Sequence, residues 1–232
     1  MPTQKPQTAT RWFRSKSMED LLQNANNPVW HDGESTKLVY DYPLPRSPWK
    51  AGRWSLRDWR SMAERHVVVD HSGKRYGLLD GVPEAELYEM GGFWCAKSPQ
   101  SHVGPFLNAV DFLIPDGTPV LAAQEGEILR VMESNTEWGD GSEFRDKVNF
   151  IDIVHASGEI SEYCHLAPHS VSAFRLRVGS GVKKGQIIGT VGKTGWTDRD
   201  HLHLVVYRDD NGNPANPLDE GRKFKSLRIR FE

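Results

Sequence analysis

Hydrophobic and polar positions alternate in short runs over most of the chain from residue 66 onward. Nine such runs predict strands, at residues 66–70, 75–79, 109–114, 120–123, 127–132, 149–155, 160–166, 186–191 and 202–207. Glycines stand between many of the runs, as turns between strands require. This spacing predicts a mainly β fold built as an antiparallel sheet, sandwich or barrel. The polar stretch 139–146 is expected to form a surface loop.

The first sixty residues have a different pattern. Ser17, followed by Asp20, predicts a short helix to about residue 24, and Ser55, followed by Asp58, predicts a second helix to residue 65. Five of the eight tryptophans lie in these sixty residues. Because scattered tryptophans beside short helices usually anchor a core, we expect this extension to pack on the main domain rather than to expose a polymer-binding surface.

Composition excludes several classes of protein. The 29 Lys and Arg residues nearly balance 31 Asp and Glu residues, and a pI near 6.5 argues against a nucleic-acid binder. Mean hydropathy is −0.58 and apolar runs are short, so no transmembrane helix is expected. The N-terminus is basic and lacks the apolar segment of a secretory signal, which leaves the localisation open. The two cysteines form no C-x-x-C pair, which excludes a cysteine-based zinc ribbon.

The most informative segment is the His201-Leu202-His203 sequence. Side chains alternate between the faces of a strand, so the two histidines share one face while Leu202 enters the core. Their Cα atoms are then about 6.5 Å apart. Both imidazoles could bind one metal ion, or one could bind it while the other faces its water.

Two partners for these histidines lie upstream. Asp111 stands within an apolar strand, where a carboxylate is costly to bury unless it is paired, hydrogen-bonded or bound to a metal. Together, His102, Asp111 and His203 offer two nitrogen donors and one oxygen donor, a set that suits a catalytic zinc with a water in the fourth position. The alternative is that Asp111 accepts backbone N–H groups in a turn and the histidines are unrelated.

Several ordered motifs resemble the lysostaphin/LytM-type zinc endopeptidases. They are Gly117-Thr118-Pro119-Val120, Tyr163-Cys164-His165-Leu166, Val182 to Gly189, Thr194-Gly195 and His201-Leu202-His203. The resemblance covers roughly residues 100 to 208. It implies a compact antiparallel β domain, here over 96–215, between the N-terminal extension (1–95) and a C-terminal tail (216–232).

The same resemblance implies a function and a set of site residues. It makes the chain a metalloendopeptidase that hydrolyses peptide bonds of bacterial peptidoglycan through a metal-activated water. His102, Asp111 and His203 would bind one zinc ion per chain. His165 and His201 would form the catalytic pair that transfers protons and stabilises the transition state. A wall substrate would place the protein in the periplasm or outside the cell.

The sequence departs from the family pattern in three places. Eight residues separate His102 from Asp111, where the compact form of the family has three. The usual small residues before the His-x-His sequence are replaced by residues 198–200, Asp-Arg-Asp, and Leu204 stands where an aromatic residue is frequent. The last two changes lie near the expected substrate groove.

The remaining histidines and cysteines receive structural interpretations. We expect none of His31, His66, His71, His155 and His169 to be a metal ligand. We expect the Cys164 thiol to be buried and free, because pairing with Cys95 would need an oxidising compartment.

Two other functions would account for parts of the sequence. A non-enzymatic regulator of wall hydrolases could share this fold, but such relatives typically lack some of the ligands. A lipoyl- or biotinyl-like carrier could explain residues 182–189, but it gives no role to His201 and His203.

Overall fold

The computed structural model describes residues 34–46, 58–70, 72–103, 106–209 and 224–232. All nine expected strands are present, each with ends within two residues of the expected range. The mainly β prediction is therefore confirmed. The helix expected at residues 17–24 lies outside the described residues.

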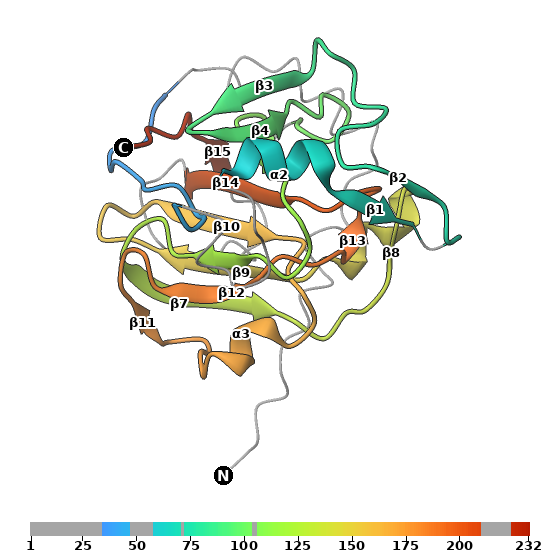
Figure 1. Cartoon of the computed structure of the whole chain (residues 1–232). Helices are drawn as coiled ribbons and strands as arrows, with labels where there is room; N and C mark the ends of the chain where they lie inside the picture. The colour runs from blue at the N-terminus through green and yellow to red at the C-terminus, as the bar shows by residue number, and fades with distance from the viewer. Residues whose placement is uncertain (1–33, 47–57, 71, 104–105, 210–223) are drawn as a thin grey trace.

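One antiparallel sheet of nine strands dominates the molecule (Figure 1). Its order is β11-β7-β9-β10-β14-β5-β4-β3, and β15 pairs with the C-terminal end of β14. The strands are β3 (Leu87–Met90), β4 (Phe93–Ala96), β5 (Val110–Phe112), β7 (Gly126–Met132), β9 (Phe150–Val154), β10 (Ile160–Cys164), β11 (Gly181–Val182), β14 (Leu202–Asp209) and β15 (Phe224–Ser226).

In the part of the chain that the structure describes, three two-stranded ribbons and three short helices surround this sheet. The ribbons are β1 (Val67–Val69) with β2 (Arg75–Gly77), β6 (Pro119–Leu121) with β12 (Ile187–Thr190), and the parallel pair β8 (Trp138–Gly139) with β13 (Gly195–Trp196). The helices are α2 (Trp59–Arg65), α3 (Ser170–Ala173) and the 3-10 helix η5 (Ser142–Lys147). The stretch 139–146 is thus not only a loop, because most of η5 falls in it. Among the described residues, no helix is long and apolar enough to cross a membrane.

The two faces of β14 carry different side chains. Leu202, Leu204 and Val206 are fully buried in the main hydrophobic core, as the alternation predicts. His203 and Val205 project to the other face. The apolar face fixes the register of the strand, since a slip by one residue would exchange the two sets.

Helix α2 begins later than the sequence predicts. Asp58 is extended (φ −149°, ψ 159°) and its carboxylate accepts from Ser61 N, so Asp58 is the N-cap and the helix cannot run through it from Ser55. Trp59 and Met62 enter the main core, where Trp59 packs on Phe93 of β4. Tryptophan packing therefore anchors this part of the extension to the sheet.

Strands β3 and β4 were missed from the sequence. They form a hairpin around Gly91 and Gly92, which both have positive φ (57° and 85°). A Gly-Gly pair between two apolar runs is a hairpin signal that could have revealed them. Because β4 pairs with β5, the expected division between residues 95 and 96 falls inside β4 of the central sheet.

A group of buried charges occupies the same sheet face as His203. Asp152 of β9 lies directly opposite Glu162 of β10, and Arg130 of β7 pairs with both carboxyl groups. The Tyr207 hydroxyl donates to Asp152 at 3.1 Å. Burial, reinforced by the facing Asp152 carboxylate, raises the pKa of Glu162 to about 8. The raised pKa favours the protonated form of Glu162.

We predict that Glu162 makes the fold less stable as the pH rises. The folded pKa lies above the ordinary value of 4.5, so the unfolded chain releases this proton first and stability falls between about pH 4.5 and about pH 8. The loss should be of the order of a few kcal/mol. Urea unfolding of wild type and Glu162→Gln at about pH 5 and about pH 9 tests this. Equal pH dependence of the two proteins would contradict the assignment.

Candidate metal centre

The centre is built where β5 pairs with β14. His203 lies directly opposite Asp111 in the register of the two strands. Both side chains leave the sheet on the same face, and His203 Nδ1 is 2.8 Å from Asp111 Oδ1. The two residues are 92 positions apart in sequence, so only strand pairing brings them together.

The loop before β5 supplies the third residue. His102 Nε2 lies 3.1 Å from Asp111 Oδ2, and its backbone N–H donates to Ser98 O at 2.9 Å. Ser98 has a positive φ of 44°, and its hydroxyl donates to Asp111 Oδ2 at 2.5 Å. This turn, which ends at His102, places His102 beside Asp111 although eight residues separate the two in sequence. Ser98 was missed from the sequence, since no motif marks a hydroxyl that acts through another residue.

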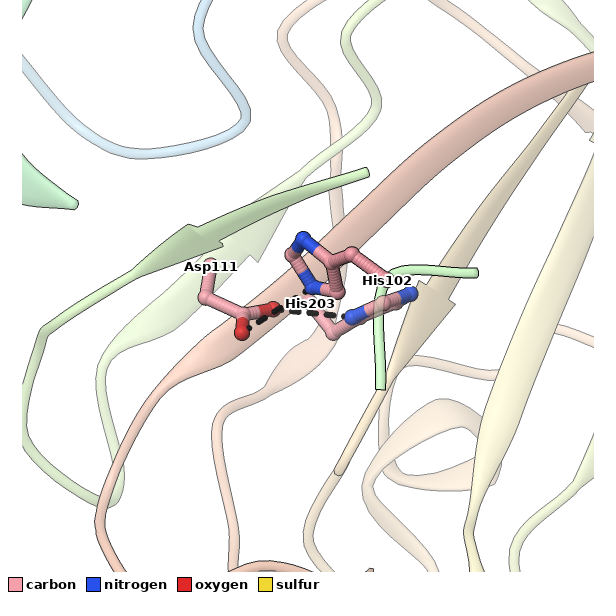
Figure 2. A group of neighbouring side chains, drawn as sticks. All are labelled: His102, Asp111 and His203. Atoms are coloured by element: carbon pink, nitrogen blue, oxygen red, sulfur yellow. Dashed lines mark hydrogen bonds and ion pairs between the residues drawn. The ribbon is translucent and has the colours of Figure 1, made fainter. Parts of the chain in front are cut away.

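The three side chains converge as a metal site requires (Figure 2). One donor atom from each of His102, Asp111 and His203 lies within 4.8 Å of the others, and all three residues are buried. Around a four-coordinate zinc, neighbouring donor atoms lie about 3.3 Å apart. His102 Nε2 is buried without a well-aligned hydrogen bond, although a carboxylate oxygen is within 3.1 Å. An unsatisfied imidazole nitrogen at this position fits a metal ligand.

The electrostatics favour the protonation states that bind metal. Burial alone would raise the pKa of Asp111, but the neighbouring His102 and His201 imidazoles and the hydrogen bond with His203 hold it well below its usual range. Burial lowers the pKa of His203. The centre therefore presents a carboxylate and a neutral imidazole, the forms that coordinate zinc.

Two more histidines stand beside the three. The ring centroids of His165 and His201 are 4.4 Å apart, and His165 lies 6.0 Å from the ring of His203. His201 Nε2 is 3.8 Å from Asp111 Oδ1. The structure thus brings all five expected site residues into one cluster.

The Nδ1 atoms of this pair are held by backbone carbonyls. His165 Nδ1 lies 2.7 Å from Thr194 O, and His201 Nδ1 lies 3.1 Å from Arg199 O. A carbonyl oxygen only accepts, so each Nδ1 carries a proton, and in the neutral tautomer so selected the lone pair is on Nε2. Burial, with His201 and His203 nearby, holds the pKa of His165 well below its usual range. His165 is also strained, with φ 63° at the end of β10.

Among the described residues, neither the other histidines nor the two cysteines join His102, Asp111 and His203 as potential metal ligands, although Cys164 lies opposite His203 in the β10–β14 register. His155 donates from Nδ1 to Glu125 O and contacts Ser161, so it is a satisfied core histidine. His31 and His71 lie outside the described residues. Cys95 and Cys164 are buried and free, and burial raises the pKa of the Cys164 thiol well above its usual range. The prediction of a buried free thiol at Cys164 is confirmed.

A hollow of about 340 Å³ adjoins the centre on the side of His102. Tyr88 and Lys97 line it from β3 and the end of the β4 hairpin, and Leu107 lines it from the loop before β5. The region before residue 96 therefore contributes to the surroundings of the site.

Residues 105–217 match peptidase family M23. This part of the chain is similar to the M23 peptidases. The lysostaphin/LytM-type resemblance is thereby confirmed. His102 precedes the matched residues by three positions, so its place beside Asp111 comes from the structure.

Curated relatives of the M23 domain agree with this assignment. Lysostaphin of Staphylococcus simulans is 39% identical over 130 residues, 55% of this chain and 24% of that protein. The DD-carboxypeptidase/endopeptidase Mpg of Neisseria meningitidis serogroup B is 34% identical over 120 residues, 52% of this chain and 24% of Mpg. The chain thus spans about a quarter of the length of these relatives. The solved catalytic domain of lysostaphin from S. simulans aligns at 33% identity, over 43% of this chain and 65% of that chain, with a TM-score of 0.33.

We predict that Ser98→Ala weakens zinc binding. The hydroxyl orients the Asp111 carboxylate, and losing such a partner lowers metal affinity by about 10- to 100-fold. Competition with a chromogenic chelator measures the affinity. Ser172→Ala is the matched control, because Ser172 is exposed in α3 and its hydroxyl donates only to a local carbonyl. Equal affinities for wild type and Ser98→Ala would remove Ser98 from the site.

Proposed function

We propose that this chain is a zinc-dependent metalloendopeptidase that hydrolyses peptide bonds in bacterial peptidoglycan. One observation supports the proposal most strongly. Three potential metal ligands, His102, Asp111 and His203, lie beside a pair of histidines in a chain that matches peptidase family M23. The two alternative functions, a non-enzymatic regulator of wall hydrolases and a lipoyl- or biotinyl-like carrier, are not favoured, because neither function needs five convergent site residues.

The proposed substrate class rests on relatives. One curated relative is a glycyl-glycine endopeptidase, ALE-1 of Staphylococcus capitis, 40% identical over 95 residues. Another is the peptidoglycan DD-endopeptidase ShyA of Vibrio cholerae, 32% identical over 113 residues. Both names describe cleavage of a peptide bond, and one names peptidoglycan. We assign the substrate class on this ground and leave the particular bond to experiment.

The donor set defines what would hold the metal. His102 and His203 would supply imidazole nitrogens and Asp111 a carboxylate oxygen, and Ser98 would fix that carboxylate. Zinc in such a site lowers the pKa of a bound water to about 7 and polarises the scissile carbonyl.

His165 and His201 would handle protons. Their Nδ1 atoms are fixed on Thr194 O and Arg199 O, which leaves each Nε2 with a lone pair. Either Nε2 can accept a proton from the attacking water. The imidazolium so formed can donate to the developing oxyanion or to the leaving amine.

We predict that His165→Ala and His201→Ala lower peptide release by about 10²- to 10⁴-fold while keeping about one zinc per chain. The assay combines metal analysis of purified protein with chromatography of peptides released from purified sacculi. New amino termini identify the bond that is cleaved.

His169→Asn is the matched control, because His169 is exposed and asparagine tolerates its positive φ of 56°. This variant should retain wild-type activity. Wild-type protein that holds a full equivalent of zinc and leaves sacculi of several wall types intact would contradict the proposed function.

A further inference from the structure

The segment just before His201 is tied to the β1–β2 hairpin and the turn after it. Arg199 Nη1 donates to Leu78 O and to Asp80 O, each at 3.1 Å. The Tyr76 hydroxyl donates to Asp198 O. These contacts bridge about 120 residues of sequence, so they join the first hairpin of the described chain to the strand that carries the site.

Asp200 forms a second tie in the same place. This residue is only 2% exposed, and its Oδ2 accepts from His66 Nε2 at 2.8 Å and from Asp116 N at 3.1 Å. Lys193 Nζ lies 2.9 Å from the other carboxylate oxygen. Two hydrogen bonds on one oxygen and a lysine ammonium group beside the other hold this buried carboxylate in a defined position.

These ties reach the ring of His201 through Arg199. The Arg199 carbonyl accepts a hydrogen bond from His201 Nδ1, and the Thr197 hydroxyl, which donates to the same carbonyl at 2.7 Å, lies 3.2 Å from that Nδ1. The side chain of Arg199 is fixed on the hairpin turn, and its carbonyl holds the tautomer of the histidine two residues later. A shift of this segment would therefore rotate His201 or release its Nδ1 proton.

We propose that three residues, Arg199, Asp200 and His66, position the catalytic histidine His201. Through them, residues 66–80 hold residues 198–200 in place. The Nε2 atom of His201 is thereby kept directed at the site. The proposal rests on the proposed function for its catalytic meaning. Residues 198–200 are where this sequence departs from the small residues usual before the His-x-His sequence. The departure has a structural role here, since Arg199 and Asp200 supply the side chains that bind the hairpin.

The ¹⁵N spectrum of the histidine rings tests the positioning directly. In mildly alkaline solution, long-range ¹H–¹⁵N correlation of the wild-type full chain should show His201 protonated at Nδ1. In Arg199→Ala and His66→Ala, the His201 ring should shift toward a mixture of both tautomers. Arg60→Ala is the matched control, because Arg60 pairs with Glu89 in the same extension but contacts no residue of 198–200 in the described structure.

The kinetics of peptide release from purified sacculi provide a second measurement. Arg199→Ala and His66→Ala should lower kcat by about 10- to 100-fold with KM and zinc content nearly unchanged. His66→Gln keeps an N–H donor for Asp200, and Arg199→Lys keeps one donor for the turn carbonyls, so both should recover part of kcat. These conservative variants also cover the case in which an alanine variant fails to fold.

The ring spectra and the kinetics together distinguish a failure of the positioning role from a failure of the proposed function. Unchanged His201 ring signals and unchanged kcat in Arg199→Ala and His66→Ala would overturn the positioning role. If wild-type protein cleaved no sacculi, the proposed function would fail, and the ring spectra alone would still decide whether the hairpin holds His201.

Discussion

The site depends on one ionised carboxylate buried in an otherwise apolar sheet. Asp111 is 5% exposed between Val110 and Phe112 of β5, where an unpaired charge would cost several kcal/mol. Imidazoles from two elements and the hydroxyl of Ser98 surround it. A divalent cation between these donors would compensate the charge most completely. Much of the surrounding structure, from the β5–β14 register to the turn at Ser98, serves to bring these donors to this carboxylate.

The two histidines beside the carboxylate, His165 and His201, are also held by hydrogen bonds. His165 and His201 each donate a hydrogen bond from Nδ1 to a backbone carbonyl, so backbone conformation determines which nitrogen is available for chemistry. Gly195, with φ 86°, follows Thr194, and a Cβ on it would lie 2.7 Å from the Cβ of Val148. The Thr194-Gly195 motif is thus explained by a turn that places the Thr194 carbonyl against His165.

Much of this could be predicted from the sequence, because alternation and turn residues are local signals. The nine strands and the convergence of His102, Asp111 and His203 followed from such signals and from ordered motifs. The roles of His66 and Ser98 could not be predicted in this way. His66 acts through Asp200, 134 residues away, and Ser98 acts through Asp111, 13 residues away, and only the folded chain brings these partners together. The two-residue strands β8 and β13 are too short to show a period.

We propose above that His102, Asp111 and His203 together bind zinc. X-ray absorption at the zinc edge, on protein loaded with one equivalent, tests it most directly when wild type is compared with His102→Ala. We expect wild type to show only nitrogen and oxygen neighbours, with the scattering signature of two imidazoles, and the variant to lose one imidazole. A sulfur neighbour, or an unchanged imidazole count in His102→Ala, would contradict the account.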